Sequence, residues 1–224
     1  MPAALCYQGI RLRYCVVDKP ETVREQVRFT RDQLKRFSGK TLPDLISHQV
    51  RLLFVGINPG LRSVAVQAHF APRGNRFYPA LFSAGITDHL IDASPGFAIA
   101  DREYLLGRGI GITSLVERAT ASAAELTVDE LVKGAHKLSR VVQEFSPQVV
   151  AILGITAYRA AFDDRLAKLG KQSTPYPATE LWVVPNPSGR NAHASLDRLA
   201  AAYGEAARAA GIRAVLQARR RAHT

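Results

Sequence analysis

The sequence contains few of the residues that hold metal ions, redox centres or disulfide bonds. Its 224 residues include two cysteines, six histidines, one methionine and one tryptophan. Cys6 and Cys15 lack the spacing of a zinc or iron–sulfur site, and the sequence shows no His-x-x-x-His pair and no clustering of carboxylates with histidine. We therefore expect no metal and no cofactor, and we expect both cysteines to stay reduced.

Long apolar runs and acidic residues are also scarce. No apolar run is long enough to span a bilayer, and the N-terminal residues lack the apolar core of a secretory signal. We therefore expect a cytoplasmic protein with no membrane partner. Nineteen Asp and Glu stand against thirty Lys and Arg, which gives a formal net charge of +11 and an isoelectric point near 10.1. This excess suits a polyanionic partner such as DNA or RNA, although a basic tail without a partner gives the same count.

The order of apolar segments predicts an α/β fold. Apolar runs bounded by turn residues alternate with segments of helical periodicity, a pattern typical of a parallel sheet covered on both faces. We therefore expect a three-layer α/β/α domain with a central, mostly parallel sheet of four to five strands. The strands are predicted at residues 49–57, 109–116, 147–154 and 179–187, and helices at residues 75–85, 126–145, 155–162 and 192–211.

Three parts of the chain differ in composition. Residues 1–45 form an N-terminal extension that is partly helical, because residues 21–37 carry apolar side chains at helical spacing among Arg and Lys. Residues 46–212 carry the alternating pattern and form one domain, which is a normal size for a single core. Residues 213–224 form a basic C-terminal tail. Residues 85–109 are polar and acidic, and we expect mainly a solvated loop there.

Two of the predicted strands end in an Asn-Pro turn. The first reads FVGINPGLRS at residues 54–63, and the second reads WVVPNPSGRN at residues 182–191. Because ligands bind at the carboxyl ends of parallel strands, both loops are expected at one edge of the sheet, facing one crevice. Two structural alternatives remain: Asn58 forms an Asx-turn before proline, and Ser188 or Asn191 caps the last helix.

Other catalytic motifs fail their tests. No Lys-Ser/Thr follows Gly60, as a phosphate-binding P-loop requires, and GRGIGI at residues 107–112 precedes a strand instead of following one. Neither Ser63 nor Ser188 has the flanking glycines of a nucleophile elbow. The remaining candidate for a catalytic group is the side-chain amide of an Asn that lies in a pocket. An Asn side chain orients a water molecule but is too weak a base to remove its proton.

The two Asn-Pro motifs resemble those of a known enzyme family. GINPGLRSVAVQAHFAPRGNRFYPAL at residues 56–81 and PNPSGRN at residues 185–191 are similar to the two motifs of the mismatch-specific uracil-DNA glycosylases, relatives of thymine-DNA glycosylase. The resemblance covers residues 41–212. It implies a monofunctional DNA glycosylase of the bacterial cytosol or nucleoid, which flips uracil from a mispair with guanine and hydrolyses its N-glycosidic bond. It also implies a monomer without cofactor that binds double-stranded DNA with U:G or T:G mispairs.

The resemblance assigns a role to each motif residue. It makes Asn58 the residue that holds the attacking water, while the backbone of Gly56 and Ile57 contacts the flipped base and Phe70 stacks on it. Phe70 alone is as well explained as an ordinary core residue. Residues assigned to loop support are Pro59, Gly60, Asn75 and Arg76. Residues assigned to the DNA wedge and to contacts with the orphan guanine are Asn186, Pro187, Ser188, Gly189, Arg190 and Asn191.

Several alternatives stay open at the level of sequence. Arg190 stands where some relatives have an apolar wedge. A carboxylate at Asp88, Asp92, Asp101 or Glu117 would supply the second water activator that Asn58 lacks. Thymine and ethenocytosine are further candidate bases. The activity itself has two competitors: a protein that binds mismatches or abasic sites without cutting, and an unrelated nucleotide-binding α/β enzyme.

Overall fold

Five short strands form the centre of the structure, a computed structural model that describes residues 28–189 and 194–215. The strands are β1 (Leu52–Gly56), β2 (Ile110–Ser114), β3 (Val149–Leu153), β4 (Gly170–Gln172) and β5 (Glu180–Val184). Their order in the sheet is β2-β1-β3-β5-β4. Neighbouring strands are parallel except β4, which runs antiparallel to β5 at the edge. The predicted mostly parallel sheet of four to five strands is confirmed.

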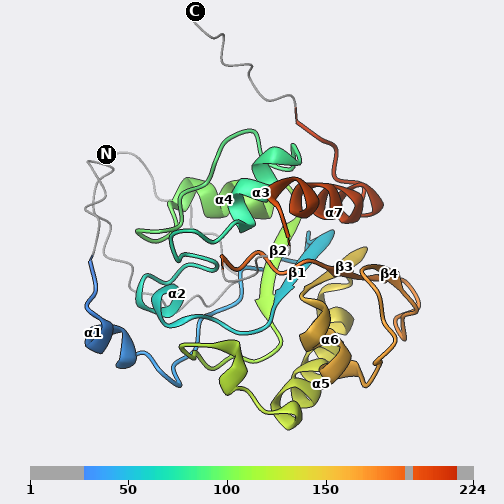
Figure 1. The fold of residues 1–224 in the computed structure, drawn as a ribbon. Helices are drawn as coiled ribbons and strands as arrows, with labels where there is room; N and C mark the ends of the chain where they lie inside the picture. Colours follow the sequence, from blue (N-terminus) through green and yellow to red (C-terminus); the bar gives the residue numbers. More distant parts are fainter. Residues whose placement is uncertain (1–27, 190–193, 216–224) are drawn as a thin grey trace, which may run out of the picture.

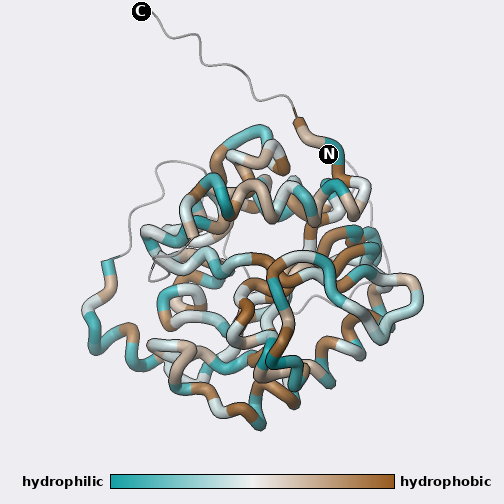
Figure 2. Tube along the Cα trace, turned by 45° about the vertical axis from the view of Figure 1, so that its right-hand side comes forward, coloured by the Kyte–Doolittle hydropathy of each residue, from teal (hydrophilic) through white to brown (hydrophobic). Residues whose placement is uncertain are grey.

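Helices cover both faces of the sheet, as Figure 1 shows. Leu52 and Phe54 pack with side chains of α3 (Phe77–Ser83), α4 (Ile99–Gly107) and α7 (Leu196–Ala209). Leu53 and Val55 point to the opposite face and pack with α5 (Val128–Phe145) and α6 (Ile155–Phe162). This alternation follows from the strand period of two residues. Figure 2 shows the hydrophobic stretches gathered along the central strands. The predicted three-layer α/β/α arrangement is confirmed.

The helix ends follow from local side chains. Thr127 and Glu130 form the predicted capping box at the start of α5. The N-cap of α7 is Ser195, whose side chain accepts from the backbone of Arg198. The alternative in which Ser188 or Asn191 caps the last helix is therefore wrong, and that helix begins later than residue 192 because its cap lies at Ser195.

One glycine brings a helix unusually close to a loop. Gly134 lies in the middle of α5, where a Cβ atom would approach the carbonyl oxygen of Leu115 to 2.5 Å. Only a residue without a side chain permits this approach. The loop that follows β2 therefore rests directly on the backbone of α5.

Some elements were not predicted from the sequence. These are α2 (Leu61–Ala65), α4, the 3₁₀ turn η1 (Ala123–Glu125) and the edge strand β4. In the N-terminal extension, helix α1 is limited to Arg31–Lys35, because Thr30 caps it in an extended conformation. Residues 21–27 of the predicted helix lie outside the described residues. The boundaries of the extension, domain and tail stay predictions. Among the described residues, no helix is long and apolar enough to cross a membrane.

Candidate active site

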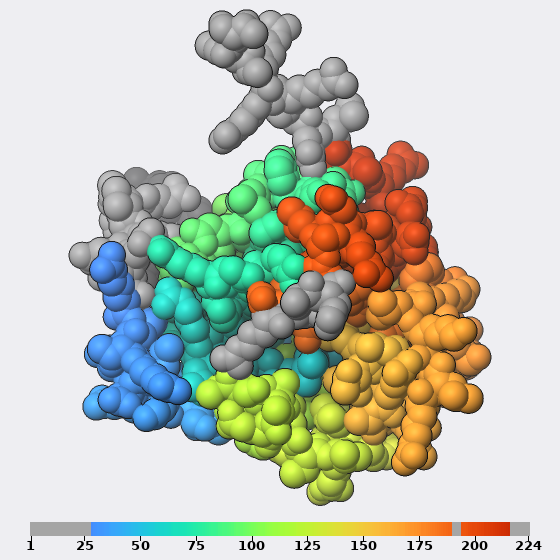
Figure 3. Space-filling model, in the orientation of Figure 1, coloured from blue at the N-terminus to red at the C-terminus, as the bar shows by residue number. Residues whose placement is uncertain are grey.

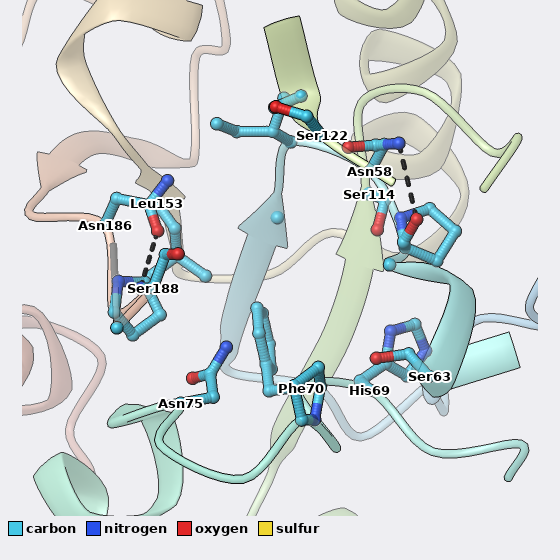
Figure 4. A pocket seen from close by; sticks show the side chains of 18 of the residues that line it. Asn58, Ser63, His69, Phe70, Asn75, Ser114, Ser122, Leu153, Asn186 and Ser188 are labelled. Atoms are coloured by element: carbon cyan, nitrogen blue, oxygen red, sulfur yellow. Dashed lines mark hydrogen bonds between the residues drawn. The ribbon is translucent and has the colours of Figure 1, made fainter. Parts of the chain in front are cut away.

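The carboxyl ends of the strands open onto a cavity of about 670 Å³. Because β1 and β5 are both parallel to β3, the two Asn-Pro loops leave the sheet at the same edge. Figure 4 shows side chains from both loops facing this cavity. The sequence-predicted residues that line it are Gly56, Ile57, Asn58, Pro59, Gly60, Phe70, Asn75, Asn186, Pro187, Ser188 and Gly189. Arg190 and Asn191 lie outside the described residues.

The side chain of Asn58 is held in one orientation by its nitrogen. Nδ2 donates to the hydroxyl of Thr120 at 2.8 Å, to the carbonyl of Arg118 at 3.0 Å and more weakly to the carbonyl of Pro59 at 3.3 Å. Carbonyls only accept hydrogen bonds, so the amide cannot be turned round without losing these contacts. The Thr120 hydroxyl in turn donates to the carbonyl of Ser122 at 2.8 Å. Oδ1 of Asn58 accepts no hydrogen bond from the described residues and faces the cavity (Figure 4).

Phe70 forms one wall of the cavity. One face of its ring stacks on Phe77, with centroids 4.1 Å apart and an interplanar angle of 29°. Its edge lies over Gly56, where a Cβ atom would meet the ring and the Ser114 hydroxyl at 3.4 Å. The backbone of Phe70 has a φ of 55°, a left-handed conformation that costs a non-glycine residue on the order of 1–3 kcal/mol. Phe70 is thus both packed against the core and exposed to the cavity.

His69 lies beside Phe70 and is neutral. Burial lowers its pKa to about 4, although a hydrogen bond to the Pro43 carbonyl opposes the shift. Because that carbonyl only accepts, the Nε2–H of His69 donates to it at 2.9 Å, and Nδ1 is left as an acceptor. A neutral imidazole therefore lines the cavity at physiological pH. It neither attracts nor repels an anionic group by charge.

The second loop has its own set of supports. Oδ1 of Asn186 accepts from the backbone of Ser188 at 2.8 Å, which makes an Asx-turn. The hydroxyl of Tyr203 donates to the Pro185 carbonyl at 3.0 Å. A Cβ atom on Gly189 would come within 2.9 Å of the Gly74 carbonyl, so this loop touches the backbone of the segment between α2 and α3. These contacts fix the loop at the mouth of the cavity.

Asn75 and Arg76 support different features. Oδ1 of Asn75 accepts from the backbone of Phe77 at 2.9 Å, and the rest of its side chain faces the cavity (Figure 4). The guanidinium of Arg76 donates to the carbonyl of Ser188 at 2.9 Å and to the carbonyl of Ala194. Arg76 therefore holds the second loop, on both sides of residues 190–193, and not the loop that carries Asn58.

None of the four candidate carboxylates lines the cavity. Glu117 forms an ion pair with Lys137 at 2.6 Å. Asp88 and Asp101 both contact the imidazole of His89, at 2.6 and 2.9 Å. Three side chains that the sequence does not group therefore meet here, because α4 brings Asp101 to a pair that is adjacent in sequence.

The fourth carboxylate, Asp92, accepts from the backbone of Ser94. Among the described residues, the cavity contains no Asp or Glu. No group of three or more His, Cys, Asp or Glu suited to a metal ion occurs in the described part of the chain.

Other residues at the cavity were not predicted from the sequence: His69, Arg73, Ser114, Thr120, Ser122 and Leu153. Ser114 and Leu153 are the last residues of β2 and β3, so the rule that placed the Asn-Pro loops also points to them. Thr120 reaches the site through a contact between loops, in which its backbone donates to the Pro59 carbonyl at 3.3 Å. No local pattern indicates that contact.

A solved structure and a family model are similar to the chain. A solution NMR structure of a candidate uracil DNA glycosylase from Methanosarcina acetivorans is similar to the chain, with 14% sequence identity and a TM-score of 0.46. That match covers 73% of this chain and 93% of the other, and at this level it carries no argument of its own. A family model described as the uracil DNA glycosylase superfamily matches residues 43–207, which is most of the chain. The chain therefore belongs to the uracil DNA glycosylase superfamily, whose members are DNA glycosylases that hydrolyse N-glycosyl bonds.

Proposed function

We propose that the protein is a monofunctional, mismatch-specific uracil-DNA glycosylase that initiates base excision repair. It removes uracil opposite guanine and leaves an abasic site, acting as a monomer in the bacterial cytosol or nucleoid. One observation carries this proposal: Asn58 presents a fixed amide oxygen to a cavity in which the described residues include no carboxylate. Such a site orients a water molecule and does not deprotonate it.

The reaction needs little more than this orientation when the leaving group is good. Water attacks C1′ of the deoxyribose, and the bond between C1′ and N1 breaks with its electron pair remaining on uracil. Oδ1 of Asn58 accepts a hydrogen bond from the water and sets its direction. The proton of the water goes to solvent or to the departing uracil anion. With no strong base at the site, we expect slow turnover.

The walls of the cavity suit a flipped pyrimidine. Phe70 offers an aromatic surface that is anchored from behind by Phe77, and stacking of a base on such a ring is worth about 1–3 kcal/mol. Nδ2 of Asn75 donates no hydrogen bond to the described residues, and uracil has two carbonyl acceptors for such a donor. Gly56 leaves room between the Phe70 ring and the Ser114 hydroxyl.

The preference for mispairs follows from the second loop. Flipping a base out of the duplex costs a few kcal/mol, and the cost is least where the pair is already weak, as in U:G. A side chain inserted into the stack offsets part of that cost. The loop of Asn186–Gly189 stands at the mouth of the cavity in position for this role. Residues 190 and 191, which the motif assigns to the wedge, follow directly.

The test is an excision assay under single-turnover conditions on duplexes that contain U:G, U:A, T:G or ethenocytosine, and on single-stranded uracil DNA. We expect free uracil and an alkali-labile site, fastest with U:G. Equal rates on U:A and on single strands would contradict mismatch specificity but not uracil excision. Tight binding to U:G without any free base would support the alternative, a protein that binds mismatches or abasic sites without cutting.

A further inference from the structure

We propose that residues 28–40, here called the basic segment, bind the phosphate backbone of duplex DNA beside the cavity. The segment contains α1 and lies outside the residues that the family model matches. The inference rests on the proposed function only in taking DNA as the partner. It assigns a role to a part of the chain that the excision chemistry does not need.

The charge of the basic segment is strongly one-sided. It contains five Lys or Arg and a single acid, Asp32. Asp32 is paired with Lys35 at 2.9 Å, so this one acid is already neutralised by a neighbour. The remaining cations form no ion pair with a carboxylate among the described residues and are all exposed; they are Arg28, Arg31, Arg36 and Lys40.

The apolar side of the segment holds it against the domain. Phe37 packs with Leu61 of α2 around the buried Leu42 and Val64. The guanidinium carbon of Arg62 lies 5.8 Å from the centre of the Phe29 ring. The apolar side chains are thus used for docking, and the cations are left to face solvent. The exposed cations take no part in this docking and are therefore available to a partner, here the DNA.

The segment is docked next to the site and not elsewhere on the surface. The backbone of Gly39 donates to the Ala119 carbonyl at 2.9 Å, and the backbone of Ala119 donates to the Lys40 carbonyl at 2.8 Å. The next residue, Thr120, is the one whose hydroxyl holds Asn58. In Figure 3 the segment (blue) lies at one side of the face that is shown. A duplex engaged at the cavity would therefore extend past these cations.

The chemistry of the four side chains fits phosphates. Arginine presents a rigid fork of donors that matches phosphate geometry, and three of the four cations are arginines. Contacts with phosphate position a protein on DNA without reading the sequence. Each phosphate that is neutralised steepens the dependence of log affinity on log salt by about 0.9. The segment should therefore contribute to affinity and to salt dependence but not to the choice of base.

The experiment compares two variants of the full chain with the same change in charge. The first is R28Q/R31Q/R36Q/K40Q. The matched control is R140Q/R165Q/K168Q/R208Q, which removes four exposed cations from α5, from the loop after α6 and from α7. Fluorescence anisotropy gives Kd for a U:G duplex at several salt concentrations, with the Tm of each variant as a check on folding.

We expect the first variant to bind at least 10-fold more weakly than wild type at 0.1 M salt and to lose about 0.9 from the salt slope for each phosphate contact removed. The control should change affinity less than threefold. Equal losses in both variants, or no loss in the first, would overturn the inference. Uracil excision by the wild type is measured in parallel. Its absence would contradict the proposed function while leaving the binding comparison intact.

Discussion

The two Asn-Pro loops share a motif but use their amide groups in opposite ways. In the first loop, the nitrogen of Asn58 is bound by the protein, and its oxygen is left for the cavity. In the second, the oxygen of Asn186 is bound by the loop's own backbone. The amide oxygen of Asn58 therefore faces the cavity, whereas that of Asn186 shapes the backbone of its own loop.

The partners of each loop explain the difference. Asn58 is reached by the loop after β2, which brings the Arg118 carbonyl and the Thr120 hydroxyl to its nitrogen. The oxygen of Asn186 accepts instead from the amide of Ser188, two residues on in the same loop. A short motif therefore does not determine the role of its Asn. The segments that pack against it do.

The largest effect is expected from Asn58→Ala, which is compared with removal of the second amide in Asn186→Ala. Asn58→Ala should lower the single-turnover rate of uracil excision on the order of 100-fold or more, as when one positioned polar group is removed from an active site. Binding to a U:G duplex should change little, because Asn58 contacts no phosphate in this proposal. Rates and Kd are measured on the same preparation.

The matched variant is Asn186→Ala, which removes the Asx-turn. It should weaken DNA binding and lower excision by about 10-fold or less, because a local hydrogen bond is worth about 1 kcal/mol. If the two variants lose excision equally, the proposed division of roles between the loops is wrong.

The second contrast concerns the glycines of the two loops. Gly189→Ala would bring a Cβ atom to 2.9 Å from the Gly74 carbonyl, whereas no atom lies within 4 Å of a Cβ at Gly60. Overpacking of about 1–3 kcal/mol at Gly189 corresponds to a loss of about 5-fold to 150-fold in excision. Gly60→Ala should stay within twofold of wild type. A loss with Gly60→Ala and none with Gly189→Ala would contradict the contact between Gly189 and the Gly74 carbonyl.

The smallest expected effect is a pH dependence of stability that arises from the loop after β2, which contacts Asn58. Arg118 donates two hydrogen bonds to Glu130, and this contact together with the capping box holds the pKa of Glu130 at about 2, below its usual 4.5. A lowered folded-state pKa contributes stability that is fully present above pH 4.5 and is lost as pH falls towards 2.

Glu130→Gln keeps a side chain that suits the capping box but removes the charge. The Tm difference between wild type and Glu130→Gln, measured from pH 7 to pH 3, should therefore shrink as the pH falls. A difference that stays constant over this range would show that the ion pair does not stabilise the fold.

Much of the fold followed from the sequence because buried strands have a strong local signal. β1, β3 and β5 are continuous apolar runs, and α5 has both a capping box and a clear periodicity. β4 was not predicted because its three residues, Gly-Lys-Gln, are polar and pair only as an edge. α4 was not predicted because a single one of its residues, Leu105, is buried.

The residues of the site likewise include some that the sequence predicted and some that it did not. The motif pointed to Asn58 and Phe70, both of which line the cavity, while their functional roles stay predictions. The orientation of Asn58 depends on Thr120, 62 residues away in sequence. The neutral state of His69 depends on burial and on Pro43. Neither is encoded in a local pattern, because each arises only when distant segments pack together.

Gly134 limits which amino acids the protein tolerates at this position of α5. A glycine inside a helix costs about 1 kcal/mol relative to alanine, yet α5 keeps one where it touches the Leu115 carbonyl. The spacing between helix and loop is thus set by main chain alone, and five residues further along that loop Thr120 holds Asn58. In a mutational scan, the exposed side of α5 should accept many residues, and position 134 should accept almost none. An intolerant position outside the cavity lining would report on the geometry of the site without touching the substrate.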